Sequence, residues 1–183
     1  MNRNVLVITG SPRKGGNTEM MADAFIKGAL ETGHSVNKFE AGLETISGCD
    51  ACDTCWSTGY ACTHDDGFRK LEPLLEAADV LVFASPLYFY GITAQLKCVL
   101  DKLYAYLSGD CKRPLKILEM VLLLCGETDI TREFNGAVDT MGCSARFMEW
   151  KFNKVLTVTE VCDPGDIADT DGLRKAEEMG RAL

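Results

Sequence analysis

The segment Gly10–Thr18 combines residue types that bind phosphate groups. Its glycines let the backbone approach a ligand closely, Arg13 and Lys14 bring positive charge, and Ser, Asn and Thr side chains can donate hydrogen bonds. A helix is expected to begin at Asn17, so that free N–H groups and the positive end of the helix dipole point at the turn. An anion at this turn would be stabilised without a dedicated cage of side chains.

Spacing within this loop narrows the choice of phosphate ligand. A P-loop needs Lys and then Ser or Thr after its second glycine, but Gly16 and Asn17 follow Gly15. The dinucleotide pattern G-x-G-x-x-G fails as well, because Pro12 stands two residues after Gly10. A terminal phosphate monoester such as that of FMN remains. The alternative is an ordinary turn between a strand and a helix, whose Gly and Asn serve only the backbone.

Four cysteines lie close together with the spacing C-x-x-C-x-x-C-x6-C: Cys49, Cys52, Cys55 and Cys62. Two C-x-x-C steps in series bring three thiolates to one centre, as in ferredoxin-type [4Fe–4S] sites, and Cys62 can supply a fourth ligand. Zinc, free thiols or a regulatory disulfide are the alternatives. The other five cysteines are expected to be small buried residues: Cys98, Cys111, Cys125, Cys143 and Cys162.

A second loop, Pro86–Gly91, offers a flat apolar surface. Pro86 fixes the exit from a buried strand, Tyr88–Tyr90 supply aromatic rings, and Gly91 frees the backbone to turn. An isoalloxazine ring needs such surroundings, and N–H groups at the Gly126 turn could stabilise charge at its edge. The alternatives are aromatic rings that plug the core and a plain turn at Gly126. No catalytic acid or base is nominated, because hydride passes directly between a nicotinamide and a flavin.

Alternating strands and helices must position these loops. Buried strands are expected over residues 4–9, 79–84 and 115–124, a more exposed one over 36–41 and a last one over 154–161. Helices are expected over 17–31, 93–107 and 171–183, with further ones around Phe134–Met141 and over Phe68–Ala78. In the last of these, Pro73 marks either a start at Glu72 or a bend. Residues 42–67 are expected to be irregular.

This alternation predicts an α/β fold with a five-stranded parallel sheet between two helical layers. The expected strand order is the doubly wound 2-1-3-4-5, in which ligands bind beyond the carboxyl ends of the strands beside the first strand. The three loops 10–18, 86–91 and 125–128 should meet there.

Size and charge limit the remaining choices. A chain of 183 residues is most simply one domain. Its net charge of −8 argues against nucleic acid as a partner, and the apolar runs are too short for a signal peptide or a membrane span. Nine cysteines without an export signal fit reduced thiols or metal ligands in the cytoplasm.

Taken together, the motifs at 10–18, 65–66, 85–89, 95–97 and 101–102 resemble the NAD(P)H-dependent FMN reductase family of flavodoxin-like proteins. The resemblance covers nearly the whole chain and implies that residues 1–183 form a single FMN-binding domain with a Cys-rich loop at about 42–67. It also implies a homodimer or homotetramer in which a neighbouring subunit helps to cover the flavin. The flavin-binding residues that it implies are Ser11, Arg13, Asn17 and Thr18 at the phosphate, Pro86, Leu87, Tyr88, Phe89, Tyr90 and Gly91 at the ring, and Cys125 and Gly126 at the ring edge.

Three functions therefore compete. The first is an FMN-dependent oxidoreductase with NAD(P)H as donor and a flavin, a quinone or a protein redox partner as acceptor. The cysteine spacing also resembles the iron–sulfur flavoproteins, a branch of the same family, which implies an electron carrier passing electrons between a [4Fe–4S] cluster and FMN. The third is a non-catalytic module that binds a phosphate ligand or a metal, for which the aromatic loop would have no explanation.

Overall fold

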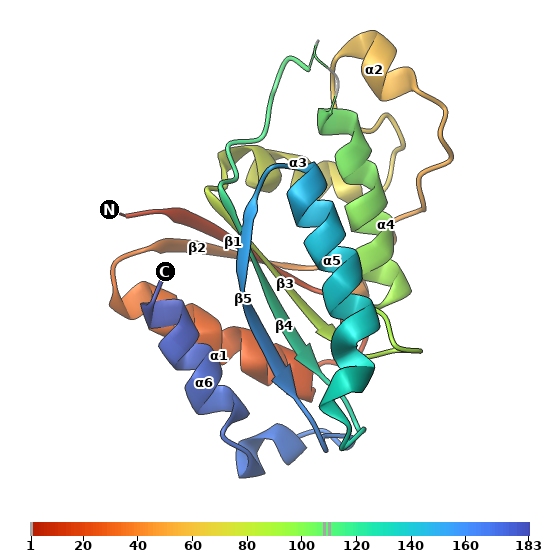
Figure 1. The fold of residues 1–183 in the computed structure, drawn as a ribbon. Helices are drawn as coiled ribbons and strands as arrows, with labels where there is room; N and C mark the ends of the chain where they lie inside the picture. Colours follow the sequence, from red (N-terminus) through yellow and green to blue (C-terminus); the bar gives the residue numbers. More distant parts are fainter. Residues whose placement is uncertain (1, 108, 110) are drawn as a thin grey trace.

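A five-stranded parallel sheet lies between two layers of helices in the computed structural model, which describes residues 2–107, 109 and 111–183 (Figure 1). The strands are β1 (Asn4–Thr9), β2 (Ser35–Glu40), β3 (Val80–Pro86), β4 (Glu119–Cys125) and β5 (Lys151–Val158). The helices are α1 (Asn17–Glu31), α2 (Thr54–Thr58), α3 (Phe68–Ala77), α4 (Ala94–Lys102), α5 (Asn135–Phe147) and α6 (Gly172–Arg181), with 3-10 turns η1 (Ala41–Leu43), η2 (Leu103–Tyr106), η3 (Thr131–Phe134) and η4 (Asp166–Asp169). The strand order β2-β1-β3-β4-β5 confirms the predicted topology.

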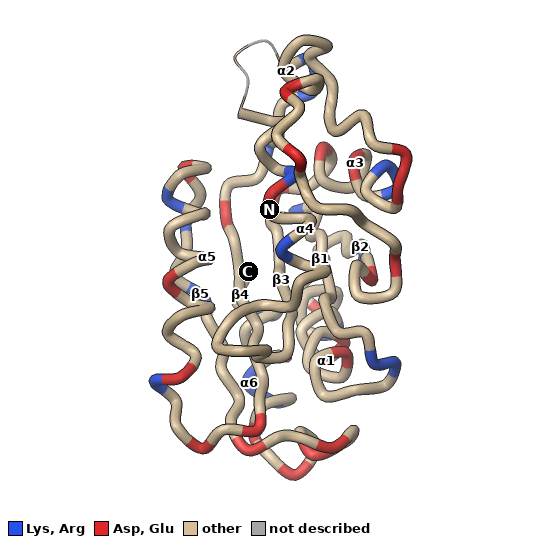
Figure 2. Tube along the Cα trace, turned by 90° about the vertical axis from the view of Figure 1, so that its right-hand side faces the viewer, with Lys and Arg blue, Asp and Glu red and all other residues tan. Residues whose placement is uncertain are grey.

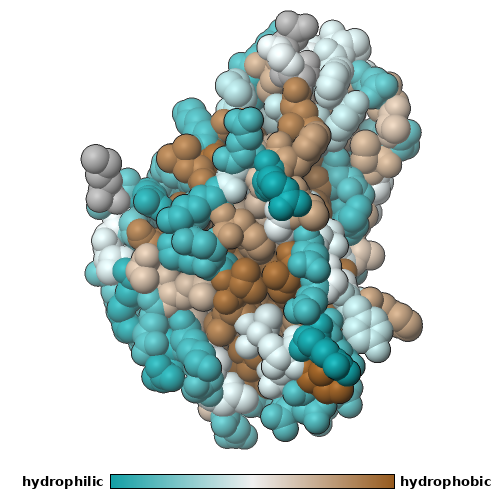
Figure 3. Space-filling model, viewed as in Figure 1, coloured by the Kyte–Doolittle hydropathy of each residue, from teal (hydrophilic) through white to brown (hydrophobic). Residues whose placement is uncertain are grey.

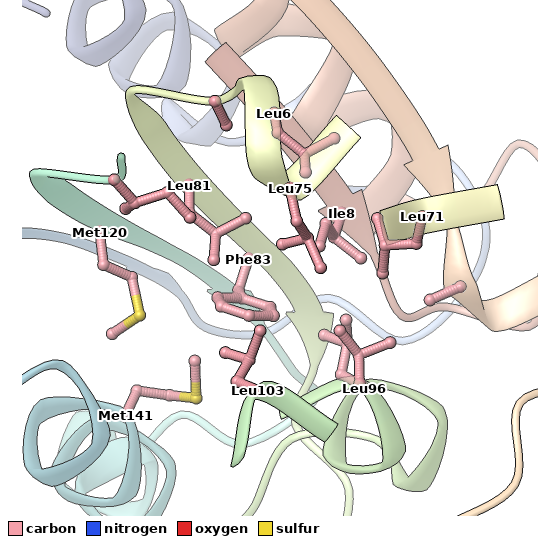
Figure 4. Close-up of a cluster of buried hydrophobic side chains, with 14 of the residues drawn as sticks. Leu6, Ile8, Leu71, Leu75, Leu81, Phe83, Leu96, Leu103, Met120 and Met141 are labelled. Atoms are coloured by element: carbon pink, nitrogen blue, oxygen red, sulfur yellow. The ribbon is translucent and has the colours of Figure 1, made fainter. Parts of the chain in front are cut away.

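Alternation along the central strands supplies both faces of the sheet with apolar side chains. Leu6 and Ile8 of β1 face the layer of α3, α4 and α5, whereas Val5 and Val7 face α1 and α6. Figure 4 shows the first of these two cores, in which Phe83 of β3 lies among leucine and methionine side chains from the sheet and the helices. Because both faces are buried, the central strands must be apolar throughout.

The predicted bounds of the last two strands are wrong. β4 begins at Glu119 rather than at residue 115, because its pairing starts where β3 starts, at Val80. An apolar run does not show where pairing begins, and Leu118 just before the strand is 71% exposed. β5 covers Lys151–Val158 rather than 154–161. As an edge strand it mixes polar and apolar residues, so its first residues lack the apolar run that marks a central strand.

In the middle of the chain, one prediction is confirmed and one needs correction. Helix α3 starts at Phe68, as its apolar pattern predicts, and Pro73 lies inside it, so the alternative start at Glu72 is wrong. Asp66 Oδ1 accepts the Phe68 N–H at 2.9 Å, which satisfies one free donor at the start of the helix. The segment 42–67 is not irregular throughout, because it contains part of η1 and the short helix α2.

The open edge of the sheet at β5 presents apolar surface bordered by hydrophilic side chains (Figure 3). Lys151 and Lys154 lie on this strand, and charged residues at an edge oppose pairing with another sheet. Among the described residues, no helix is long and apolar enough to cross a membrane.

Thr93 fixes the start of α4, the helix that follows the aromatic loop. Its side chain accepts the Leu96 N–H, and its own N–H donates to Ser85 Oγ at 3.0 Å. We expect Thr93→Ala to lower the free energy of unfolding by about 1 kcal/mol, because the cap is lost at a buried position. Thr93→Ser keeps the hydroxyl and should lose less than half as much in urea denaturation. Equal losses for both variants would assign the effect to the methyl group instead.

Candidate functional site

A cavity of 240 Å³ opens at the carboxyl ends of β1, β3 and β4. The three loops expected to meet there all contribute to it, and a fourth loop, after β5, closes its other side. Its lining comprises Ser11, Arg13, Gly16, Asn17, Thr18, Pro86, Leu87, Tyr88, Cys125, Gly126, Glu127, Val161, Cys162 and Pro164. Nine of these residues are among the flavin-binding residues named from the sequence. Gly16 and Glu127 belong to the expected loops without being named, and Val161, Cys162 and Pro164 were not expected.

The loop before α1 presents backbone donors to this cavity. Gly16 is the N-cap of the helix and has no side chain to occupy the free N–H groups of the first turn. The backbone of η1 packs directly against the outside of this loop at Gly42. Only glycine fits there, because a Cβ on Gly42 would lie 2.1 Å from the carbonyl oxygen of Ser11. Within the loop, Ser11 Oγ accepts the Arg13 N–H at 3.2 Å. A helix N-terminus with open donors favours an anion.

Asn17 connects this loop to the segment that sequence reasoning missed. Its side-chain Nδ2 donates to the carbonyl oxygen of Asp163 at 2.9 Å, and its Oδ1 accepts the N–H groups of Gly165 and Ile167. The Asn17 side-chain amide therefore already makes three hydrogen bonds within the protein. A phosphate role for Asn17 stays a prediction, and the backbone N–H at this position is the group best placed for it.

Thr18 and Cys125 form the floor of the cavity. Thr18 Oγ1 lies 3.3 Å from Cys125 Sγ, and both side chains are buried. Burial raises the pKa of the Cys125 thiol to about 11, against the smaller opposite effect of its hydrogen bond with Thr18. The thiol therefore stays protonated at neutral pH and joins the start of α1 to the end of β4.

The aromatic loop forms a tight turn that projects from the protein. Tyr88 and Gly91 exchange two backbone hydrogen bonds of 3.0 Å, and the residues between them have φ angles of 47° (Phe89) and 64° (Tyr90). Phe89 is fully exposed and Tyr90 is 60% exposed. The rings of these two residues do not plug the core, and neither residue lines the cavity. Their role at a flavin ring, and that of Gly91, stay predictions.

This turn holds bulky residues in a strained conformation. A left-handed backbone costs a residue with a Cβ about 1–2 kcal/mol, and Phe89 has no packing to lose. We expect Phe89→Gly to raise the free energy of unfolding by about 1 kcal/mol, less a few tenths for the extra freedom of glycine in the unfolded chain. Phe89→Ala removes the ring but keeps the Cβ, so thermal denaturation should show no gain. A gain from Ala equal to that from Gly would contradict the strain argument.

Acidic groups border the cavity on the side of β4 and β5. The Glu127 carboxylate raises the pKa of the exposed Cys162 thiol, with smaller effects of desolvation and Asp163. Figure 2 shows acidic residues along the loops at this lower end of the protein. Across from them, the Gly15 N–H and then Lys38 hold the pKa of Glu19 below its usual value, against the opposing effect of burial. Arg13, whose Nη1 lies 3.3 Å from the Cys162 carbonyl oxygen, is the cation at the rim.

The four cysteines of the Cys-rich segment line one small pocket, together with Lys102 and Tyr104. Burial raises the pKa of the Cys55 thiol, and the neighbouring Cys62 and Cys52 add to this effect. The four thiols thus line one pocket, and their donor chemistry fits an iron–sulfur cluster. Which group they hold stays a prediction.

A buried ion pair supports this pocket. Lys102 Nζ donates to Asp66 Oδ2 at 2.5 Å, and the Lys102 side chain is fully buried. Burial alone would raise the pKa of Asp66, but hydrogen bonds from Lys102, Ser47 and the Phe68 N–H hold it well below its usual value.

The cysteine pocket and the cavity lie at opposite ends of α4. Thr93 caps the helix beside the aromatic loop, and Lys102 at its last turn lines the cysteine pocket. Nine residues at about 1.5 Å each place Thr93 and Lys102 roughly 14 Å apart along the helix. In Figure 1 the cysteine segment around α2 lies at the top, whereas β3 and β4 end at the bottom.

The remaining cysteines are not all buried, which corrects the expectation for them. Cys125 is buried, Cys98 and Cys111 are half-buried, and Cys143 and Cys162 are exposed. Cys143 lies on the outer side of α5, and Cys162 lies in the loop after β5, where no second layer covers it. No disulfide joins any of the nine cysteines, all of which lie among the described residues.

Several known proteins are similar to this chain in sequence or in fold. An iron–sulfur flavoprotein of Archaeoglobus fulgidus is 37% identical over 99 residues, which cover 54% of this chain and 44% of that protein. One of Methanosarcina thermophila is 34% identical over 95 residues, covering 52% and 49%. The chain thus spans about half the length of the curated relatives it matches. The structure of an NAD(P)H:quinone oxidoreductase from Methanothermobacter marburgensis superposes with a TM-score of 0.77 at 20% identity, covering 100% of this chain and 98% of that one.

A family model covers the part of the chain that builds most of the site. The model for NADPH-dependent FMN reductase matches residues 3–118, from β1 through the segment before β4. The matched region includes the loop before α1, the cysteine segment and the aromatic turn. This chain belongs to the NADPH-dependent FMN reductase family.

Proposed function

We propose that this chain is an FMN-dependent oxidoreductase that takes electrons from NAD(P)H and works in the cytoplasm as a single FMN-binding domain. The observation that supports it most is the position of the cavity, at the carboxyl ends of β1, β3 and β4, with the N-terminus of α1 on one side. Mononucleotides bind at this switch point in doubly wound folds. Of the three functions that the sequence leaves open, the FMN-dependent oxidoreductase thus fits the geometry best.

The residues of the cavity fit the phosphate end of FMN. The N–H groups at the start of α1, Ser11 Oγ and the Arg13 guanidinium would hold the phosphate, with Thr18 beneath them. A volume of 240 Å³ is below the roughly 300–1,000 Å³ of enclosing ligand sites. The ring would therefore extend to the mouth of the cavity, where Pro86–Tyr88 and the Gly126 turn lie.

When bound, FMN supplies the hydride and electron transfer chemistry. The chain's own part is to bind and orient. The Gly126 N–H donates to the Val158 carbonyl oxygen at 3.0 Å, so the N–H groups of Glu127 and Thr128 would be the donors at the ring edge, and the aromatic turn offers a cover. No side chain is assigned a catalytic role, and an exposed ring edge leaves room for a nicotinamide, a flavin or a quinone.

NAD(P)H oxidation by the FMN-loaded protein tests this proposal. We expect anaerobic bleaching of the flavin absorbance on addition of NADH or NADPH, followed by recovery with free FMN or a quinone as acceptor. Binding of FMN without bleaching by either nucleotide would overturn the reductase function while leaving the FMN site intact. A protein that binds no FMN would overturn both.

A second candidate is an iron–sulfur electron carrier, which the convergence of four cysteines on one pocket favours. The relatives from Archaeoglobus fulgidus and Methanosarcina thermophila described above carry the name iron–sulfur flavoprotein. Because most of the length of α4, roughly 14 Å, lies between the aromatic loop and the cysteine pocket, transfer between the two sites would be faster if a second copy of the chain brought its cysteine pocket to this cavity. The candidate therefore includes a homodimer or homotetramer.

Iron and sulfide analysis of protein purified without oxygen tests the second candidate. We expect about four iron and four sulfide per chain if the four thiolates hold a [4Fe–4S] cluster. Sedimentation of the same sample gives the number of subunits. Absence of both elements, or a monomer with a complete cluster, would contradict the carrier function as described.

A further inference from the structure

The cysteine segment contains a second set of metal-binding side chains besides its four thiols. Ligand atoms of Asp50, Cys52 and His64 all lie within 4.8 Å of one another. Asp50 Oδ2 lies 3.3 Å from His64 Nε2. Zinc bonds of about 2.0–2.3 Å in a tetrahedron place neighbouring ligand atoms roughly 3.3–3.8 Å apart. The three side chains are thus close to the separation that one zinc ion requires.

Hydrogen bonds on the other side of the ring decide which nitrogen of His64 is free. Ser47 Oγ donates its one proton to Asp66 Oδ2 at 2.7 Å, so it accepts at its 3.0 Å contact with His64 Nδ1. Nδ1 therefore carries a proton, and the lone pair of a neutral imidazole is on Nε2. This lone pair faces the carboxylate of Asp50, an arrangement that a cation between the two would stabilise.

The outer contacts of His64 lead through the exposed Ser47 and the half-buried Asp66 to the fully buried Lys102. Asp66 accepts hydrogen bonds from Ser47 and from the fully buried Lys102. A series of hydrogen bonds runs from the His64 imidazole through the Ser47 hydroxyl and the Asp66 carboxylate to the Lys102 ammonium, and it holds the imidazole ring in one orientation. Metal-bound histidines are typically held in this way, by a hydrogen bond from the second ring nitrogen to a group that is itself anchored.

We propose that the cluster-free protein binds one Zn²⁺ through Asp50, Cys52 and His64. One carboxylate, one thiolate and one imidazole form a donor set that suits Zn²⁺, and a fourth position stays open to water. The Asp50 side chain is 60% exposed, so the ion can enter from solvent. On binding, the Cys52 thiol releases its proton to the buffer and its sulfur bonds to the metal. The site does not depend on FMN, and it competes with a four-cysteine cluster for Cys52.

X-ray absorption of bound zinc tests the ligand set directly. The sample is FMN-loaded protein, freed of metal with a chelator under a reductant and then given one equivalent of Zn²⁺. We expect one sulfur at about 2.3 Å and the remaining ligands, nitrogen and oxygen, at about 2.0–2.2 Å. Three or four sulfur ligands would overturn the proposal in favour of an all-thiolate site.

Matched variants separate the two ligand sets by affinity, measured by competition with a chromophoric zinc chelator. We expect His64→Asn and Cys52→Ser to weaken zinc binding at least 100-fold, and Ser47→Ala to weaken it about 10-fold through loss of the outer contact. Cys55→Ser and Cys62→Ser, which lie outside the three ligands, should bind within threefold of the unchanged protein. An equal loss in Cys62→Ser and His64→Asn, or no loss in His64→Asn, would overturn the proposal.

Two controls keep this result independent of folding and of the flavin. Each variant is compared by circular dichroism and thermal denaturation without zinc, and its FMN content is measured. A variant that keeps its fold and its FMN content but loses zinc supports the site. If no variant binds FMN, the proposed oxidoreductase function fails, and the zinc measurement still decides the present proposal.

Discussion

Ser11→Asp is expected to weaken FMN binding on the order of 100-fold, which corresponds to about 2.7 kcal/mol. Ser11 lines the cavity at the N-terminus of α1, where the phosphate is proposed to bind. A carboxylate about 5 Å from a phosphate charge, at an effective dielectric of about 20, is repelled by roughly 3 kcal/mol. The new carboxylate would also accept the N–H groups that the phosphate needs. Fluorescence titration of the apoprotein with FMN measures the change.

Ser11→Asn is the matched control for this variant. Asn has nearly the shape of Asp without its charge, and like Asp it can accept the Arg13 N–H that Ser11 Oγ accepts now. FMN affinity should therefore fall less than tenfold in Ser11→Asn. The gap between the two variants should shrink at high salt, since the Asp effect is electrostatic at a partly exposed site. Equal losses at all salt concentrations would place the phosphate elsewhere.

The sheet could be predicted because its central strands leave little choice. β1, β3 and β4 are apolar on both faces, and runs such as Val80–Ala84 have no other stable place than inside a parallel sheet. The edge strand β5 was placed three residues late, since Lys151 and Asn153 interrupt its apolar pattern. The apolar pattern therefore predicts the bounds of a strand only where both of its faces are buried.

The side of the cavity formed after β5 could not be predicted in the same way. It depends on Asn17, whose side chain bonds to residues 163–167, nearly 150 positions away in the chain. Asn at the start of a helix predicts a cap or a turn from local sequence alone. The pairing with a distant loop depends on where α6 and β5 place that loop, which no local pattern encodes.

The cysteine segment and the aromatic turn differ in how far local sequence predicts them. C-x-x-C steps restrict the thiols to a short loop, so their convergence on one pocket followed from the spacing. Phe89 and Tyr90 adopt positive φ angles that bulky residues avoid, so a local prediction favours other conformations. Such strain persists when the surrounding structure imposes it, and it occurs most often at functional sites.

Lys102→Met is expected to lower the free energy of unfolding at pH 7 by about 3–5 kcal/mol, because it leaves the Asp66 carboxylate buried without its cation. In the unchanged protein the pKa of Asp66 lies below its usual value: burial opposes this shift, but hydrogen bonds from Lys102 and Ser47 exceed it. A depressed pKa in the folded state contributes stability that is present above the unfolded pKa of about 3.9 and is lost as the pH falls below it.

In Lys102→Met this pH dependence becomes weaker. Without the ammonium, burial is opposed only by the hydrogen bonds from Ser47 and the Phe68 N–H, so the folded-state pKa of Asp66 is higher than in the unchanged protein and less stability is lost in acid. The difference between the two proteins should therefore be largest near pH 7 and should shrink as the pH falls below 4, in urea denaturation at several pH values. The double variant Asp66→Asn, Lys102→Met removes both charges and should recover more than half of the loss at pH 7, since replacing a buried ion pair by neutral groups is often nearly neutral. Two results together would contradict this account: a double variant as unstable as Lys102→Met, and a stability difference between Lys102→Met and the unchanged protein that does not vary with pH. They would mean that the lysine stabilises the protein through packing on Phe68 rather than through its charge.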